Sequence, residues 1–191
     1  MIRAFVAVPV EDPVTRRRLA GARSLVPRLH GVRWIPEGQL HFTLKFLGEI
    51  AEERVASARG ATVRAAASAP FRLALEGLGA FPPRGPARVL WAGCGEGAGA
   101  LSRLADAVEA AFLAEGFPPE ERPFSPHLTL ARVKDPDAGR RISRALPSIP
   151  AEPFGEVAVS SLVLYRSELT PRGAEYDELL RVALEFPAAP Q

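Results

Sequence analysis

The sequence predicts a protein of mixed α and β structure whose two halves repeat in outline. Segments typical of strands and of helices alternate along the chain, and one short motif occurs once in each half. A loop rich in proline and glycine marks the boundary between the halves. With 191 residues, of which 47% are hydrophobic and 24% charged, the chain is large enough to bury a core. General disorder is therefore excluded.

The first half opens with an apolar segment, residues 2–8, that ends at Pro9 and predicts a buried strand. Asp12 can cap a helix that has Pro13 at its first position and runs toward Pro27. An extended approach follows around Trp34. The remaining elements of this half are a strand, an Ala-rich helix and a third strand, expected at 40–47, 51–67 and 71–78.

The second half follows the loop at 79–88 and repeats this order. Its strands are expected at 89–92, 126–133 and 154–165, and its helices at 99–115 and 136–146. The segment 174–185 has helical propensity, whereas a strand there would make the two halves match, and propensity alone leaves this open. The tail from Pro187 is expected to be loose.

The amino-acid composition excludes several classes of protein. Cys94 is the only cysteine, which excludes an intramolecular disulfide and a zinc site with several cysteine ligands. No apolar run approaches the roughly 20 residues of a membrane helix, and the N-terminus lacks a secretory signal pattern. We expect a cytoplasmic monomer with no membrane association and no obligate protein partner. The net charge is only +2, and arginine supplies nearly all of the positive charge. This composition favours a local anion site over a broad nucleic-acid surface.

The repeated motif is His-x-Thr-Leu, which starts at His41 and again 86 residues later at His127. Each copy lies in a predicted strand, where successive side chains point to opposite faces. His41 therefore shares one face with Thr43, and His127 shares the corresponding face of its strand with Thr129. A single copy would most simply be a strand histidine satisfied by a neighbouring hydroxyl. Two matched copies indicate two imidazoles directed at one site.

Two imidazoles at one site suit acid and base catalysis, because an ordinary pKa near 6.5 lets one be neutral while the other is protonated. Each threonine hydroxyl can donate a hydrogen bond to a phosphoryl oxygen. The sequence has no His-Glu-x-x-His motif and no Gly-x-Ser-x-Gly motif, so neither a zinc site nor a serine nucleophile is supported. We expect no metal and no cofactor.

Four segments resemble the RNA 2',3'-cyclic phosphodiesterases, also described as 2'-5' RNA ligases, of the two-histidine (2H) phosphoesterase superfamily. They are RAFVA at 3–7, HFTLKFLG at 41–48, PHLTLAR at 126–132 and LYRS at 164–167. The resemblance implies an α+β fold of two pseudo-symmetric lobes, approximately 1–84 and 85–191, and allows strands to be exchanged between them. Each lobe is an antiparallel sheet with helices packed outside, and the active-site cleft lies between the sheets. The last segment would then be a strand.

The resemblance also implies a reaction and its residues. His41 and His127 would be the catalytic pair, Thr43 and Thr129 would hold the phosphate, and Arg132 would contact it. The implied substrate is RNA, or a nucleotide, with a 2',3'-cyclic phosphate end, which is hydrolysed to a 2'-phosphate without metal. His127 would be the base and His41 the acid, and the same pair could also join a 5'-hydroxyl to the cyclic end, which is 2'-5' ligation. The residues alone do not assign acid and base, because the two motifs are nearly symmetric.

Two of the expected substrate-binding residues depend on local strand geometry. Strict alternation places Arg132 on the face opposite His127, so a bulge or the strand end must turn it toward the site. Otherwise it is a surface arginine. Lys45 has the same parity as His41 and Thr43, which places it at the site unless it is a solvated lysine near the strand end.

Two alternative functions remain open at this point. Gly93, Gly95 and Ala98 form a Gly-x-Gly-x-x-Ala motif between a strand and a helix, as in dinucleotide-binding proteins. That fold needs a parallel strand ending in an acidic residue about 20 positions further on, whereas Glu115 ends a helix. The other alternative is a module that binds RNA ends without turnover. Loss of a motif histidine or threonine would favour it, and none is lost here.

Overall fold

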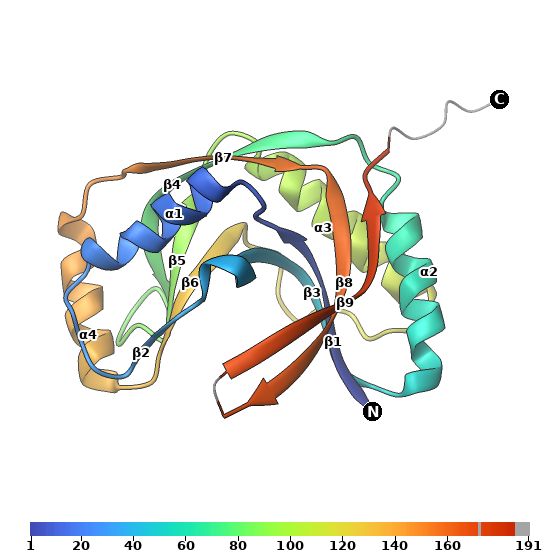
Figure 1. Ribbon diagram of the computed structural model, residues 1–191, viewed down its shortest axis with the longest axis horizontal. Coiled ribbons are helices and arrows are strands. Elements are labelled where there is room, and N and C mark those ends of the chain that lie inside the picture. The colour runs from blue at the N-terminus through green and yellow to red at the C-terminus, as the bar shows by residue number, and fades with distance from the viewer. Residues whose placement is uncertain (172, 186–191) are drawn as a thin grey trace.

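The computed structural model describes residues 1–171 and 173–185 (Figure 1). The strands are β1 (Ile2–Pro9), β2 (Val32–Trp34), β3 (His41–Ile50), β4 (Phe71–Phe81), β5 (Val89–Cys94), β6 (His127–Val133), β7 (Pro153–Val159), β8 (Ser161–Thr170) and β9 (Gly173–Ala183). The α-helices are α1 (Pro13–Gly21), α2 (Val55–Ala65), α3 (Ala98–Ala114) and α4 (Pro136–Ala145). The tail from Pro187, expected from the sequence to be loose, lies outside the described residues.

The strands form two antiparallel sheets, which confirms the predicted fold class. The first sheet has the order β3-β1-β8-β9 and the second has the order β2-β6-β5-β4-β7. Each half of the chain supplies strands to both sheets, because β1 and β3 join β8 and β9 while β2 and β4 join β5 to β7. The two sheets therefore do not coincide with the two halves of the chain, and the division into lobes at 1–84 and 85–191 stays a prediction.

The helices pack against these sheets and close two clusters of buried side chains. α2 packs on α3 and contacts β8 and β9, and α3 also contacts β3, whereas α1 contacts β7 and α4 contacts β6 (Figure 1). The larger cluster includes Phe42 and Phe112 and joins α2 and α3 to the sheets. The smaller cluster, with Leu90 and Ile142, lies at α4. No helix within the described residues is long and apolar enough to cross a membrane.

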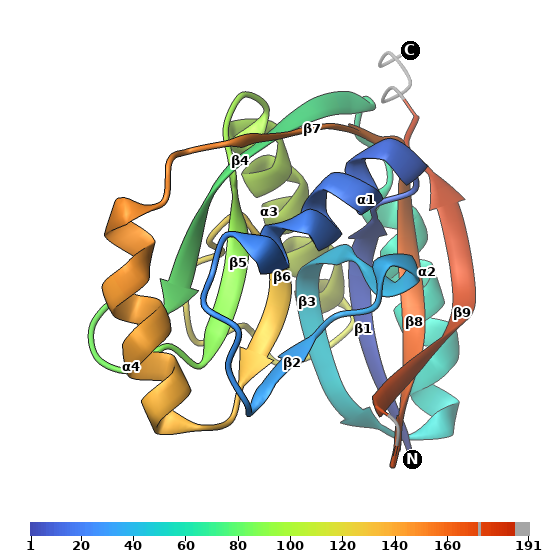
Figure 2. The ribbon, with the colours of Figure 1, turned by 60° about the vertical axis from the view of Figure 1, so that its left-hand side comes forward.

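The strands that carry the two motifs lie side by side where the sheets meet (Figure 2). β3 is the edge strand of the first sheet, and its first residue is His41. β6 begins with His127. Only the last three residues of β6 pair with β2, so the first part of β6 is also an edge. Beyond β2, the N–H of Ile35 donates to the carbonyl of Leu130 at 2.8 Å. The fold thus brings together two strand edges that start with histidine.

The strand predicted over 154–165 is wrong in one respect. Ser160 separates β7 from β8, and these strands belong to different sheets. The sequence conceals the crossover, because buried residues continue from Val157 and Val159 at the end of β7 into the start of β8, with no proline or glycine between the two strands. The segment with helical propensity forms β9, which pairs along its length with β8. Tertiary pairing here overrides local preference, as the resemblance implied.

The dinucleotide-binding alternative is wrong. β5 pairs antiparallel with both β4 and β6, so Gly93, Gly95 and Ala98 do not lie in a parallel βαβ unit. Close packing explains the two glycines. A Cβ atom on Gly93 would lie 2.7 Å from the carbonyl oxygen of Glu76, and one on Gly95 would lie 2.8 Å from the carboxylate of the same residue. The glycines let the chain pass close to β4 on its way into α3.

Candidate active site

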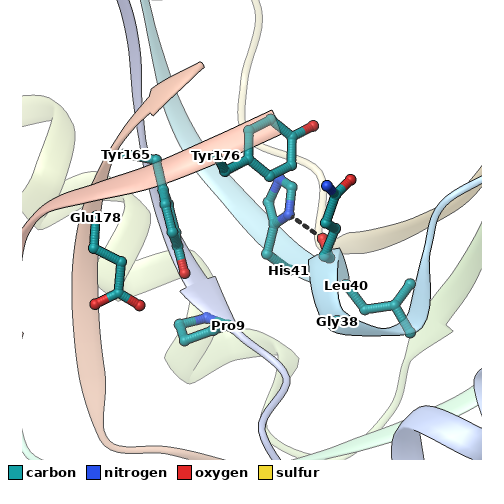
Figure 3. A pocket seen from close by; sticks show the side chains of 8 residues that line it. Pro9, Gly38, Leu40, His41, Tyr165, Tyr176 and Glu178 are labelled. Carbon is teal, nitrogen blue, oxygen red and sulfur yellow. Dashed lines mark hydrogen bonds between the residues drawn. The ribbon is translucent and has the colours of Figure 1, made fainter. Parts of the chain in front are cut away.

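The same hydrogen bond holds each motif histidine. Nδ1 of His41 lies 2.6 Å from the carbonyl oxygen of Gln39, and Nδ1 of His127 lies 2.7 Å from that of Ser125 (the His41 contact is dashed in Figure 3). In both cases the acceptor is two residues before the histidine. A carbonyl oxygen can only accept, so both Nδ1 atoms carry the proton. Nε2 of each ring is therefore the atom that takes up or releases a proton.

The two motif threonines lie beside the histidines. Thr43 and Thr129 are half-buried, like His41 and His127, on the same face of their strands. Within the part of the chain that the structure describes, neither threonine hydroxyl has a hydrogen-bond partner. Both hydroxyls are thus free to donate to a ligand.

A β-bulge follows each threonine at the same place. The register of β3 with β1 skips Leu44, and the register of β6 with β5 skips Leu130, each the third residue after its histidine. The burial pattern repeats as well, since the 7 residues of β6 and the first 7 of β3 have the same order of half-buried, buried and exposed positions. An extra residue shifts the alternation of side chains by one. The fifth residue after each histidine, instead of the fourth, therefore returns to the histidine's face.

The bulge in β6 turns Arg132 to the face of His127, as the sequence analysis requires for a residue at the site. The side chain is exposed. Its positive charge lowers the pKa of His41 and acts in the same direction on Tyr176, which places the guanidinium toward the first sheet. Arg132, a residue of β6, thus places its positive charge near His41, the histidine of the first motif.

Contrary to prediction, the bulge in β3 turns Lys45 away from the site. Its side chain is only 2% exposed, and the ammonium donates to Oε2 of Glu109 at 2.6 Å and to the carbonyl of Pro118 at 2.9 Å. Oε1 of Glu109 accepts the N–H of Glu120 at 2.9 Å, and Oε1 of Glu120 accepts the N–H of Phe46 at 3.0 Å. Lys45 therefore ties β3 to α3 and to the segment that leads into β6.

Aromatic rings surround both histidines. The ring of Phe5 is buried, and its centroid lies 5.0 Å from that of the His41 imidazole. The ring of Tyr176 meets the same imidazole edge-on, with 5.4 Å between the ring centroids. Phe81 meets the ring of His127 edge-on at 4.9 Å. Tyr176 and Phe81 are not predictable from the sequence as neighbours of the motifs, because only strand pairing brings these distant residues to the histidines. These rings restrict the rotation of the imidazoles.

A hollow of about 160 Å³ lies beside His41, and Tyr165, Tyr176 and Glu178 are among its lining residues (Figure 3). Burial raises the pKa of Tyr165 to about 12 and also raises that of Tyr176, so both hydroxyls stay protonated at neutral pH. The carboxylate of Glu178 accepts hydrogen bonds from Arg181, which lowers its pKa. The hollow therefore offers two neutral aromatic side chains and a carboxylate that is already paired.

The protonation of His41 reflects three influences. Burial has the largest effect and lowers its pKa, the carbonyl of Gln39 raises it, and Arg132 lowers it. The net direction is downward, so His41 is neutral at neutral pH when the site holds no anion. A bound anion would oppose the charge of Arg132 and favour protonation.

The acidic, histidine and cysteine side chains are too dispersed to form a metal site in the part of the chain that the structure describes. No group of three or more of them there could hold a metal ion. Independence from metal stays a prediction.

Comparison with known proteins identifies the family. Residues 8–171 match the family model described as the 2'-5' RNA ligase superfamily. The chain belongs to this superfamily. The RNA 2',3'-cyclic phosphodiesterase of Aeropyrum pernix, a similar protein, is 38% identical over 151 residues, which are 79% of this chain and 85% of the relative. The family predicted from the sequence is thereby confirmed.

Solved structures related to this superfamily have the same fold. The protein TT0787 of Thermus thermophilus matches with a TM-score of 0.79 and 36% identity, over 97% of this chain and 100% of that one. E. coli LigT complexed with 3'-AMP matches with a TM-score of 0.77 and 28% identity, over 96% of this chain and 98% of that one. The two-sheet arrangement therefore extends over nearly the whole length of these chains.

The buried ion pair of Lys45 predicts a stability effect. Glu109→Gln leaves the ammonium of Lys45 buried without a compensating charge, so we expect the free energy of unfolding to fall by about 3 kcal/mol. Urea unfolding followed by circular dichroism measures this change, with the exposed Glu121→Gln as the control. A loss below about 1 kcal/mol would mean that the pair contributes little to stability.

The placement of Arg132 predicts a change in the titration of His41. Arg132→Gln removes a positive charge that lowers the pKa of His41, so we expect that pKa to rise. Nitrogen-15 NMR of the imidazoles as a function of pH measures it. Arg59→Gln, an exposed substitution on α2, serves as the control and should leave the titration unchanged. An unchanged or lower pKa in Arg132→Gln would contradict this placement.

Proposed function

We propose that the chain hydrolyses the 2',3'-cyclic phosphate end of RNA, or of a nucleotide, to a 2'-phosphate without a metal ion. The observation that carries the proposal is the duplicated arrangement of two histidines, each with Nδ1 held by a carbonyl and a threonine hydroxyl beside it. Opening a cyclic phosphate with water needs one base and one acid. The names of the relatives, RNA 2',3'-cyclic phosphodiesterase, agree with this reaction.

Three side chains hold the phosphate in this proposal. The hydroxyls of Thr43 and Thr129 donate to the phosphoryl oxygens from the two sheets, and Arg132 adds a charge-assisted hydrogen bond. A phosphate anion that leaves water needs several donors, and these three lie on the histidine faces of β3 and β6. Lys45 takes no part, because its ammonium is buried against Glu109.

Proton transfer follows the roles implied by the resemblance. His127 takes a proton from the water that attacks phosphorus, and the bond from phosphorus to the ribose 3'-oxygen breaks. His41 gives its proton to that oxygen, which leaves a 2'-phosphate. His41 is neutral in the empty site because of burial and Arg132, so the anionic phosphate itself favours the protonated form that an acid needs. When a 5'-hydroxyl replaces water as the nucleophile, the same steps in the same direction join two RNA ends by a 2'-5' bond and leave the 3'-oxygen as a hydroxyl.

The hollow beside His41 takes the terminal nucleoside. Tyr165 and Tyr176 offer aromatic faces on which a base or ribose can pack, and both line the hollow. E. coli LigT, a structural relative, is known in complex with 3'-AMP, which supports a nucleotide as a ligand of this fold. We propose that the protein is a cytoplasmic monomer, as expected from the sequence, and its single cysteine suits a reducing compartment.

The direct test uses an oligoribonucleotide that ends in a 2',3'-cyclic phosphate, incubated with the purified protein in excess chelator. We expect conversion to the 2'-phosphate, detected by mass spectrometry as the addition of one water and distinguished from a 3'-phosphate by phosphorus-31 NMR. Activity that is lost with chelator and restored by one metal ion would overturn the metal-free chemistry. Tight binding without any product would instead indicate a module that binds RNA ends.

We expect a large loss of turnover when either imidazole is removed. His41→Ala and His127→Ala should each lower kcat by about 10²- to 10⁴-fold, because each removes one proton transfer. The pH profile separates the roles: the wild type should be bell-shaped, His41→Ala should lose the alkaline limb and His127→Ala the acidic limb. His30→Ala is the control, since His30 lies outside both motifs. Near-normal turnover in either variant at saturating substrate would refute the two-histidine mechanism.

A further inference from the structure

A second and larger hollow lies at one end of the second sheet. Its volume is about 650 Å³, and it is bounded by the segments where β4 ends, β5 begins and β6 ends. Three basic side chains line it: Arg88, Arg122 and Lys134. Phe81 and several prolines add apolar surface to its wall. No group assigned to the phosphodiesterase reaction lines this hollow.

Positive charge is in excess in the hollow, with three basic side chains against one carboxylate. Arg88, Arg122 and Lys134 are exposed, and none forms an ion pair within residues 1–171 and 173–185. Asp135 is the one carboxylate among the lining residues, and its oxygens accept the N–H groups of the first residues of α4, Asp137 and Ala138. The hollow therefore presents three unpaired cations to a ligand.

The hollow adjoins the proposed active site on the side of His127. Phe81 lines the hollow, and its ring meets that of His127 at 4.9 Å. Val89, another lining residue, pairs in register with Arg132. The nucleoside hollow adjoins His41 instead, so the two hollows flank different histidines. A chain-like ligand that reacts at the histidines can thus continue into the basic hollow.

We propose that this hollow binds the sugar–phosphate backbone of the single-stranded RNA whose cyclic end reacts, an inference that rests on the proposed function. Several cations spread over about 650 Å³ suit a polymer with repeated charges better than one phosphate. Phe81 and the exposed proline rings give apolar surface against which bases pack. The hollow therefore discriminates RNA ends from free cyclic mononucleotides.

The test compares two substrates, 2',3'-cyclic CMP and a ten-nucleotide RNA with a 2',3'-cyclic phosphate end. The variant combines Arg88→Gln, Arg122→Gln and Lys134→Gln, and the matched control is Arg59→Gln on α2. We expect KM for the RNA to rise about tenfold or more, while the hydrolysis of 2',3'-cyclic CMP stays within about twofold of wild type. The slope of log RNA affinity against log salt concentration should become shallower by about 2. Each of the three lost contacts to single-stranded RNA contributes roughly 0.7 to this slope.

A binding measurement keeps this inference separate from the proposed function. Fluorescence anisotropy of a labelled RNA ending in a stable 3'-phosphate needs no turnover, and the triple variant should weaken its binding about tenfold. If the wild type hydrolyses neither substrate but the anisotropy result holds, the proposed function fails and the RNA surface stands. The inference is overturned if KM for both substrates rises equally, if neither rises, or if a polyglutamate peptide binds the hollow as well as RNA does.

Discussion

The hydrogen bond from each histidine Nδ1 to the carbonyl two residues earlier is the constraint on which the proposed chemistry depends. It lies at the start of both β3 and β6, with lengths of 2.6 and 2.7 Å. Because the acceptor belongs to the backbone, this bond sets the ring orientation and leaves Nε2 to exchange protons. Phe5 and Phe81 limit how far the rings can turn. The protein thus orients both imidazoles without the carboxylate partner that many catalytic histidines use.

The matched bulges determine what else reaches the histidines. Each bulge moves the residue four places after the histidine into the interior and returns the fifth to the histidine's face. In β6 the fifth residue is Arg132, which brings a cation to the proposed phosphate site. In β3 the fifth is Phe46, and the fourth, Lys45, stabilises the packing of the segment before β6. The same backbone irregularity, present in both strands, therefore places one cation at the proposed site and buries the other in the packing of β3 against α3.

Much of the site could be predicted from the sequence, because the period-two alternation of a strand is enough to pair each histidine with its threonine. Alternation alone misplaces Lys45, since a bulge has no reliable signature in a run such as HFTLKFLG, where polar and apolar residues alternate without a break as far as Phe46. The crossover at Ser160 escapes prediction for a similar reason, since buried residues continue from the end of β7 into the start of β8 and no proline or glycine separates the two strands. The aromatic walls and the basic hollow arise from pairings between distant segments, which no local pattern contains.

The tautomer of the two imidazoles is the most direct test of the site's proposed chemistry. Long-range nitrogen-15 NMR correlation spectra, recorded above the pH at which both histidines are deprotonated, distinguish a proton on Nδ1 from one on Nε2. We expect the Nδ1–H form for both His41 and His127, with His30 as an internal reference that no such carbonyl bond constrains within the described residues. The Nε2–H form at either motif histidine would contradict the proposed chemistry, because Nδ1 would then lack the proton that it donates to the carbonyl.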